Sequence, residues 1–217
     1  MDFFDTVIAF FQNGGVFMYP IVLILAFGAA IALERYLYLR STHSANRRAW
    51  REIMAALAEG DLQRAREVAE QSSAAIATIL SYGLSRSRGN ARRDEIETAM
   101  EEGLMEVLPR LEKRTHYLAT FANLATLLGL LGTIIGLIQG FTAVAGANPA
   151  EKADMLSASI SVAMNTTAFG LMVAIPLLLV HALLQTKTTE LVDNLEMSAV
   201  KFLNILTDHQ TRQDGQA

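Results

Sequence analysis

The sequence contains no cysteine and few charged residues, and these two absences exclude different classes of protein. Without cysteine, the chain has no disulfide and no thiolate metal site. Asp, Glu, Lys and Arg make up 18% of its 217 residues, whereas a typical soluble domain has about 25%. They are missing entirely from residues 6–33, 115–150 and 155–186, stretches of 28, 36 and 32 residues. Because about 20 apolar residues cross a bilayer as a helix, the sequence excludes a soluble single domain and predicts three membrane-spanning helices.

The uncharged stretches and their flanks predict an all-α integral membrane protein with long helices that extend into the cytoplasm. Phenylalanines at helical spacing near the start favour a helix that lies in the membrane interface. The predicted segments are this amphipathic helix (1–15), a first membrane helix (16–33), a helical domain (34–117), a second membrane helix (118–146), a short periplasmic loop with a helix start (147–158), a third membrane helix (159–185) and a C-terminal helix with a polar tail (186–217).

The helical domain has two candidate turns and one long candidate helix. Turn-forming residues stand at Gly60-Asp61 and from Gly83 to Asn90. Apolar residues at helical spacing from Ile96 to Leu118 predict one helix that runs directly into the second membrane helix, with a kink at Pro109.

Two prolines bear on the third membrane helix. Asn148-Pro149-Ala150-Glu151 has the pattern of a helix start, with Asn148 as the cap and Pro149 in the first helical position. Pro176 lies well inside the same predicted helix, where the missing N–H predicts a kink.

The distribution of Lys and Arg predicts the orientation of the chain. The segment from Glu34 to Arg114 holds 14 of the 18 basic residues, whereas the N-terminal arm has none and the loop after the second helix has only Lys152. By the positive-inside rule, we expect the N-terminus outside and both large polar parts in the cytoplasm. The same segment holds 13 acidic residues, so its charges favour a solvated surface and no nucleic-acid partner.

The predicted membrane helices contain no acid and no base, apart from His116 and His181 near their cytoplasmic ends. A carboxylate within the membrane is the usual sign of an ion relay, so we do not expect this chain to carry a titrating relay by itself. The glycine-rich run Gly129–Gly140 lacks the Lys-Ser/Thr pair of a phosphate loop, and no hydrolase or zinc-protease motif occurs. We therefore expect no enzyme activity, cofactor or metal.

Small and polar residues recur at helical spacing in the second and third membrane helices. Glycines at steps of three and four favour close helix packing: Gly129, Gly132, Gly136 and Gly140. Hydroxyl and amide groups favour a polar lining for something that passes or sits there: Thr133, Ser161, Asn165, Thr166 and Thr167. The alternative interpretation, which stays open, is that each hydroxyl only bonds its own helix backbone.

Three motifs in register resemble the MotA/TolQ/ExbB proton channel family, in its ExbB/TolQ branch. Around the first helix these are Gly14-Gly15, Met18-Tyr19-Pro20 and Glu34-Arg35-Tyr36-Leu37. LLGLLGTIIGL at residues 127–137 resembles the signature of the second helix, and TTAFGLMVAIP at residues 166–176 resembles that of the third.

The resemblance implies a stator subunit in the bacterial inner membrane. Five copies would form a ring around the single membrane helices of two ExbD/TolR-like partners, and each partner helix would carry an aspartate that takes up and releases protons. The resulting motion would energise transport or another process at the outer membrane or periplasm. Thr133 and Thr167 match the pore-facing threonines of the family, and Thr166, Asn165 and Ser161 complete the expected ion pathway.

Two positions depart from the family pattern. Val162 stands where ExbB/TolQ members often have a glutamate, and Thr126 stands where they tend to have a proline. The added neutral oxygens favour hard cations such as Na⁺, so a sodium-driven stator remains an alternative to the preferred proton-driven one. A structural membrane scaffold, in which the polar stripes serve only helix packing, is the other alternative.

Overall fold

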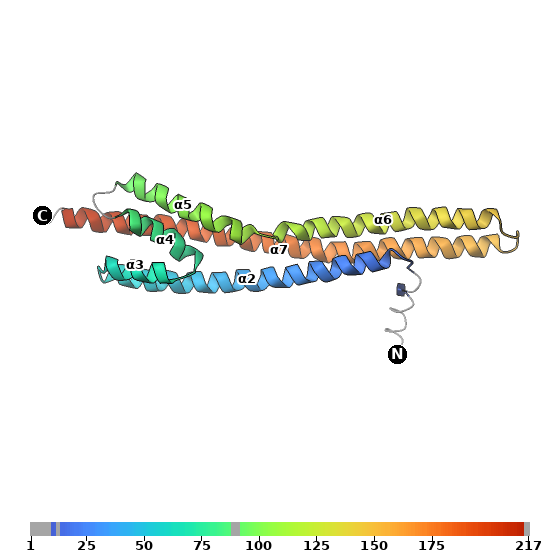
Figure 1. Cartoon of the computed structure of the whole chain (residues 1–217), viewed down its shortest axis with the longest axis horizontal. Helices are drawn as coiled ribbons and strands as arrows, with labels where there is room; N and C mark the ends of the chain where they lie inside the picture. The colour runs from blue at the N-terminus through green and yellow to red at the C-terminus, as the bar shows by residue number, and fades with distance from the viewer. Residues whose placement is uncertain (1–9, 12–13, 88–91, 215–217) are drawn as a thin grey trace, which may run out of the picture. The chain divides into compact units, whose positions relative to one another are not determined.

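The protein is all-helical in the part that the computed structural model describes, namely residues 10–11, 14–87 and 92–214, with side chains described as far as Asp208. Helix makes up 90% of the structure, and no strand occurs among the described residues. The helices are α2 (Met18–Ala58), α3 (Leu62–Gln71), α4 (Ala75–Arg86), α5 (Arg93–Glu112), α6 (Thr115–Ala145) and α7 (Lys152–Asp214) (Figure 1).

Three helical stretches are long and apolar enough to cross a membrane. They lie within Met18–Ala58, Arg93–Ala145 and Lys152–Asp208. Large hydrophobic side chains are exposed along them, including Leu127, Phe141 and Ile175. A helix that is hydrophobic on its exposed side needs lipid or another protein surface around it. The prediction of an all-α, multi-pass membrane protein is thereby confirmed.

The chain divides into two compact units. Unit 1 comprises the described residues of Met1–Glu34 and Arg114–Leu183, and unit 2 comprises those of Arg35–Lys113 and Leu184–Ala217. Helices α2 and α7 contribute to both units, whereas α6 belongs to unit 1 and α3, α4 and α5 belong to unit 2.

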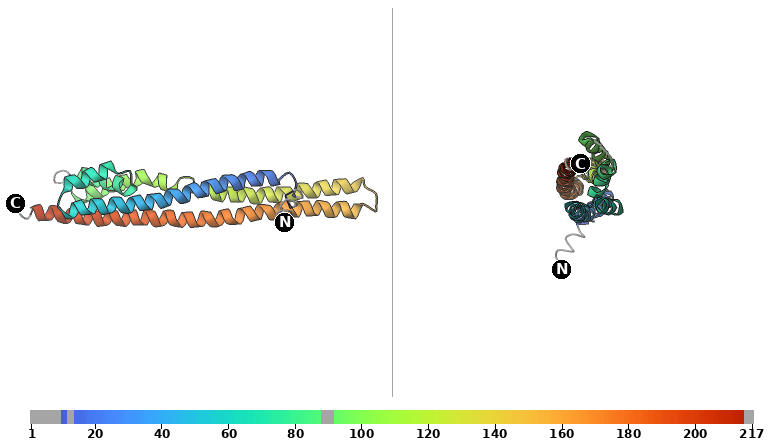
Figure 2. Two further views of the ribbon diagram at one scale, coloured as in Figure 1. Left: turned by 90° about the horizontal axis from the view of Figure 1, so that it is seen from below. Right: turned by 90° about the vertical axis from the view of Figure 1, so that its left-hand side faces the viewer.

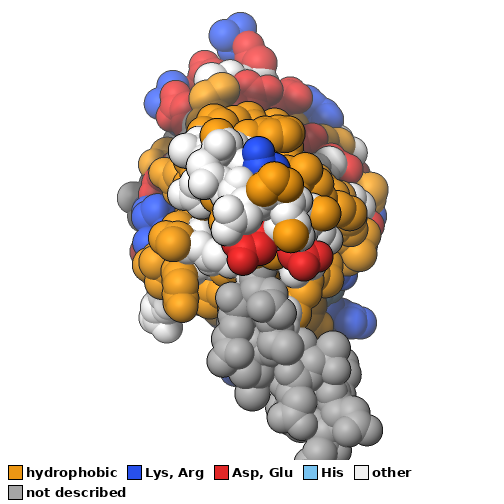
Figure 3. All heavy atoms as spheres, turned by 90° about the vertical axis from the view of Figure 1, so that its right-hand side faces the viewer, with side chains coloured by type: hydrophobic (Ala, Val, Ile, Leu, Met, Phe, Trp, Pro, Cys, Tyr) orange, Lys and Arg blue, Asp and Glu red, His pale blue; other side chains and the backbone are white. Residues whose placement is uncertain are grey.

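In unit 1, α6 and the first part of α7 lie side by side, joined by a short turn (Figures 1 and 2). Helix α2 packs closely on α7, because a Cβ at Gly28 would lie only 2.6 Å from Leu177 Cδ2. Figure 3 views the molecule from the α6–α7 turn, where a small group of charged side chains is surrounded by hydrophobic ones. These charged side chains belong to the short stretch between the two uncharged helices.

The segment before α2 also packs on α7. The rings of Phe10 and Phe11 meet the ring of Phe169 edge to face, with centroids 6.3 Å and 5.0 Å away. Gly15 has a φ of 74°, which favours glycine, and a Cβ there would lie 3.2 Å from Val162 Cγ1. The rest of the predicted interfacial helix, residues 1–9 and 12–13, lies outside the described residues.

The predicted continuous helix from Ile96 into the membrane is wrong, because the helix is interrupted at Lys113 and Arg114. Helix α5 runs through Pro109 and ends at Glu112. Arg114 then adopts a left-handed conformation with a φ of 67° and caps α6. Its guanidinium lies 3.1 Å from a Glu34 carboxylate oxygen, a half-exposed ion pair within unit 1. A left-handed residue does not continue a right-handed helix, so Arg114 separates α5 from α6.

The predicted turns are partly confirmed. Gly60 has a φ of 78°, and Asp61 caps α3 by accepting a hydrogen bond from the Arg64 backbone at 2.9 Å. Gly83, by contrast, is buried inside α4, where a Cβ would lie 2.8 Å from Met100 Cγ. Packing against α5 therefore overrides the preference of glycine for turns.

The start of the third membrane helix also differs from the prediction. Residues 148–151 form a turn in which the Glu151 N–H donates to the Asn148 carbonyl at 3.0 Å, and α7 begins only at Lys152. Pro176 lies inside α7, and the kink there stays a prediction.

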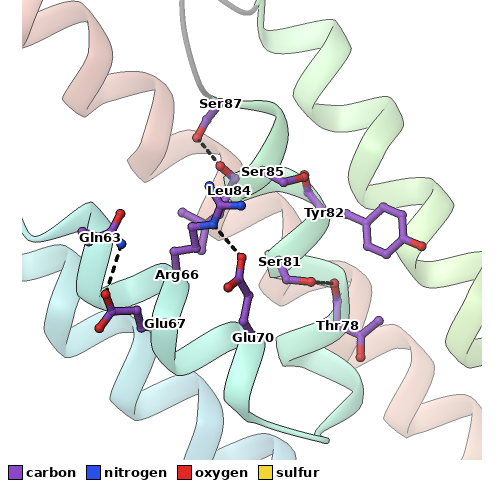
Figure 4. A network of polar contacts seen from close by, with 10 residues as sticks. All are labelled: Gln63, Arg66, Glu67, Glu70, Thr78, Ser81, Tyr82, Leu84, Ser85 and Ser87. Carbon is purple, nitrogen blue, oxygen red and sulfur yellow. Dashed lines mark hydrogen bonds and ion pairs between the residues drawn. The ribbon is translucent and has the colours of Figure 1, made fainter.

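Unit 2 buries an aliphatic core between its helices. Helix α4 contacts both α3 and α5, and the largest fully buried side chains of the unit include Ile53, Ile79, Ile96 and Phe202. Polar side chains on α3 and α4 bond locally, as Arg66 does to Glu70 at 2.6 Å (Figure 4).

Tyr82, on α4 of unit 2, donates a hydrogen bond to Glu106 at 2.9 Å. This bond and the negative charge of Glu106 raise the pKa of the Tyr82 hydroxyl. The hydrogen bond links α4 to α5.

Arg35, just past the first membrane segment, is buried (2% exposed) and holds the end of α5. Its guanidinium donates to the carbonyl of Leu111 and, at 3.5 Å, to that of Arg110. It also lies 5.0 Å from the ring centroid of Tyr38. The last carbonyls of a helix have no partner within the helix, so this charged donor satisfies groups that would otherwise be buried without one.

We predict that Arg35→Met lowers the free energy of unfolding by about 2–4 kcal/mol, because a charged hydrogen bond to buried carbonyls is lost. Thermal unfolding in detergent, followed by circular dichroism, measures the change, and hydrogen exchange locates it at the end of α5. Arg48→Met removes an exposed guanidinium from the same helix and should change stability by less than about 0.5 kcal/mol. Equal effects of the two substitutions would contradict this role of Arg35.

Candidate functional site

The structure brings the hydroxyls of Thr133 on α6 and Thr167 on α7 into direct contact. Their Oγ1 atoms lie 2.5 Å apart. Both also lie within hydrogen-bond distance of the Gly129 carbonyl oxygen, at 3.1 Å from Thr133 and 2.9 Å from Thr167. Both side chains are partly exposed. Thr133 is the 19th residue of the 36-residue uncharged stretch, so the pair lies near the middle of that stretch.

The number of hydroxyl protons determines what the Thr133–Thr167 pair can still bind. Each hydroxyl has one proton to donate and two lone pairs that accept. One of the two hydroxyls can donate to the Gly129 carbonyl while the other donates to its neighbour. Both protons are then used, and the unused groups are lone pairs on Thr133 and Thr167. In this arrangement the pair accepts a proton donor or a cation, and rotation of one hydroxyl allows it to donate instead.

Thr166 differs from its two neighbours in this site. It is buried (2% exposed), and its hydroxyl lies 2.6 Å from the Gly14 carbonyl and 2.9 Å from the Val162 carbonyl. Its single proton is therefore used by backbone oxygens. This hydroxyl ties α7 to the turn before α2, and it is closed to any ligand in this arrangement.

Ser161 and Asn165 lie one turn apart on α7, on a side that we call its open side because neither residue is buried. Ser161 is exposed and Asn165 is partly exposed. Among the residues that the structure describes, none forms a hydrogen bond with the Asn165 amide. An amide without partners is costly in hydrocarbon, so this side of α7 is suited to a protein surface or water and not to lipid.

The four glycines of α6 all lie against α7. Gly129, Gly132 and Gly140 are buried. A Cβ at Gly132 would lie 2.4 Å from Thr166 Cγ2, and one at Gly140 would lie 2.5 Å from Ser159 Cβ. At Gly136 the nearest atom is Ala163 Cβ, at 3.1 Å. The two helices thus approach along the whole glycine stripe.

Gly170, on α7, was not among the predicted site residues, although it controls the closest approach. A Cβ there would lie 2.6 Å from the Ala125 carbonyl oxygen and 3.1 Å from Gly129 Cα, and both of these neighbours are backbone. The sequence did contain a signal, since Ala163, Thr166, Gly170 and Ala174 form a stripe of small residues on one face of α7.

Among the described residues of unit 1, the uncharged stretches around the hydroxyl pair contain no Asp or Glu. Val162, one turn or so before Thr167, packs its side chain toward the turn at Gly15. Among the described residues, no group of three or more His, Cys, Asp or Glu side chains is arranged to hold a metal ion. Among the described residues, the site therefore contains hydroxyl and carbonyl groups but no carboxyl group.

Comparison with known proteins gives a consistent picture. Residues 71–197 match the MotA/TolQ/ExbB proton channel family. A protein of Methanothermobacter thermautotrophicus named as a homologue of the biopolymer transport protein ExbB is 32% identical over 203 residues, which cover 91% of this chain and 69% of the relative. The ExbB-like 1 protein of Synechocystis is 33% identical, over 84% of this chain and 72% of its own length.

A shorter similarity reaches the other named branch of these proteins. The Tol-Pal system protein TolQ of Haemophilus influenzae is 31% identical over 115 residues, which cover 53% of this chain and 48% of that protein.

We predict that Gly170→Ala lowers the free energy of unfolding by about 2 kcal/mol, because the new methyl group forces the backbones of α6 and α7 apart. Unfolding in mixed micelles, followed by circular dichroism, measures the loss. Gly146→Ala at the end of α6 is the control, because a Cβ there has nothing within 4 Å. Equal stabilities of the two variants would show that the helices are not limited by this contact.

Proposed function

This chain belongs to the MotA/TolQ/ExbB proton channel family, and we propose from that premise that it is the channel-forming stator subunit of a motor driven by the proton motive force. As an ExbB/TolQ-type protein it is a membrane energiser subunit of the proton-channel type, and the family is associated with transport and not with enzymatic chemistry. The proposal adds the role of particular residues, the partner and the direction in which work is delivered.

The observation that carries the proposal is the Thr133–Thr167 hydroxyl pair at mid-membrane depth, together with the absence of any carboxylate from the uncharged stretches around it. A proton path needs a group that titrates. The ExbB/TolQ family works with ExbD/TolR-like partners, and we propose that a membrane aspartate of such a partner binds at this pair.

The hydroxyl pair suits both protonation states of a carboxyl group. A protonated carboxyl can donate to a lone pair of Thr133 or Thr167, because neither hydroxyl needs that lone pair for its own bonds. After the proton leaves, one hydroxyl rotates and donates to the carboxylate, while the other keeps its bond to the Gly129 carbonyl. The deprotonated state has one hydrogen bond fewer, but the bond to the carboxylate is charge-assisted and stronger than the neutral bonds it replaces, so the site suits both states.

The remaining parts of the proposal concern the assembly. We propose a ring of this chain, as a pentamer, around the partner helices, in a bacterial inner membrane, with the N-terminus outside. The open side of α7 at Ser161 and Asn165 would face the partner or another copy, which would satisfy the Asn165 amide. The process that the motor energises lies at the outer membrane or in the periplasm, and the ion is H⁺.

We predict that Thr133→Val or Thr167→Val lowers proton flux about 10- to 100-fold, since a hydrogen bond to a charged group is worth about 1.5–3 kcal/mol. The flux is measured in liposomes that hold the chain together with its single-span partner. Thr142→Val is the matched control, because the Thr142 hydroxyl bonds, among the described residues, only the Ile138 carbonyl of its own helix, at 2.8 Å.

Co-purification of the partner with each variant separates this proposal from a scaffold role. Our account expects the partner to remain bound while the flux falls. A scaffold predicts that both Thr133→Val and Thr167→Val weaken assembly and leave no specific flux to lose. Full flux in both variants would contradict the assigned role of the hydroxyls.

A further inference from the structure

Unit 2 contains a groove between α2 and α7 that the proposed motor does not use. Its main cavity has a volume of about 340 Å³ and is lined by residues of both helices: Tyr36, Leu39, Arg40, His43, Lys187, Glu190, Leu191 and Asn194. We propose that this groove binds the phosphate headgroup of an anionic phospholipid. The proposal needs only a membrane-spanning chain, so it does not rest on the assigned ion pathway.

The charges of the groove favour an anion. Arg40 and Lys187 face it from opposite helices, and His43 adds a third nitrogen donor, whereas Glu190 is the only acid in the lining. Within the part of the chain that the structure describes, neither Arg40 nor Lys187 forms an ion pair. Two cations without partners on facing helices can both bind one phosphate.

The groove continues into a second cavity of about 170 Å³, which shares His43 with the first and adds Arg47 and Trp50. Asn46 lines it as well. The Asn46 carbonyl oxygen accepts from the Ile76 backbone at 3.1 Å, but its buried amide nitrogen has no partner among the described residues. A buried donor of this kind favours an occupant, or a bound water, that offers acceptor oxygens.

The position along the chain favours a lipid over a soluble phosphate. Arg40 is six residues after Glu34, about 9 Å along the helix axis, and Lys187 is the first charged residue after the uncharged stretch 155–186. Headgroups occupy a layer of similar depth next to the hydrocarbon. Tyr36, one turn before Arg40 in the same lining, is exposed, and tyrosines are enriched at this interface. The groove thus combines cations with an aromatic and aliphatic wall.

Native mass spectrometry of the full chain in detergent tests the proposal, with phosphatidylglycerol and phosphatidylcholine of the same acyl chains as probes. We expect phosphatidylglycerol to bind more tightly. Each basic residue near a membrane surface strengthens binding to anionic lipid about fivefold, so Arg40→Ala/Lys187→Ala should weaken phosphatidylglycerol binding about 25-fold. Arg40→Lys/Lys187→Arg should retain it.

The control variant, Arg48→Ala/Lys201→Ala, removes one exposed cation from each of the same helices outside the groove and should bind as the unchanged chain does. Equal binding of the two lipids, or equal losses in both double variants, would overturn the proposal. Binding of inorganic phosphate alone with the same affinity would identify a soluble anion as the ligand instead. The same spectra report the oligomeric mass, and a change confined to Arg40→Ala/Lys187→Ala would assign the groove to a contact between copies.

Discussion

The close approach of the α6 and α7 backbones at Gly129 and Gly170 is the constraint on which the candidate site depends. With glycine on both sides, no Cβ separates the two helices, and the Thr133 and Thr167 hydroxyls meet over one carbonyl oxygen. A larger residue at either glycine would increase the helix separation and break this contact before it changed any polar group. The small residues therefore set the geometry of the hydroxyl pair, because they determine how closely the two helices pack.

The uncharged helices of unit 1 also lack one kind of group that a proton path needs. Its uncharged helices supply acceptors and hydroxyl protons but no group that titrates near neutral pH at mid-membrane depth. Val162 packs its side chain toward the Gly15 turn. The buried hydroxyl of Thr166 secures the same turn by bonding the Gly14 carbonyl. In this chain, therefore, part of the predicted polar lining acts as a structural tie, and the proposed pathway rests on Thr133, Thr167 and a carboxyl from a partner.

The number of membrane helices was predictable from the sequence, because uncharged stretches of this length indicate helices that cross a membrane. Its motifs correctly indicated the family. The resemblance placed Thr133 and Thr167 in one site, and the structure brings their hydroxyls together, but contacts outside the matched motifs were not predictable. Arg35 marks the membrane boundary in the sequence, but its burial against the Leu111 carbonyl depends on a residue 76 positions away. The sequence does not predict the break at Arg114, because the apolar spacing continues across it. Pro109 is the stronger local signal for a break, but it lies within a helix that packing maintains. The sequence predicts a turn at Gly83, because only the tertiary structure shows that Met100 packs against this glycine.

The central claim is that this chain provides one half of a proton path and that a partner provides the other. Proton flux into liposomes, measured for the chain alone and for the chain with its single-span partner, tests this claim most directly. The account predicts no flux above that of empty liposomes for the chain alone. It predicts flux with the partner, independent of Na⁺, and loss of that flux when the partner's membrane aspartate is replaced by asparagine. Equal proton flux through the chain alone would contradict the account.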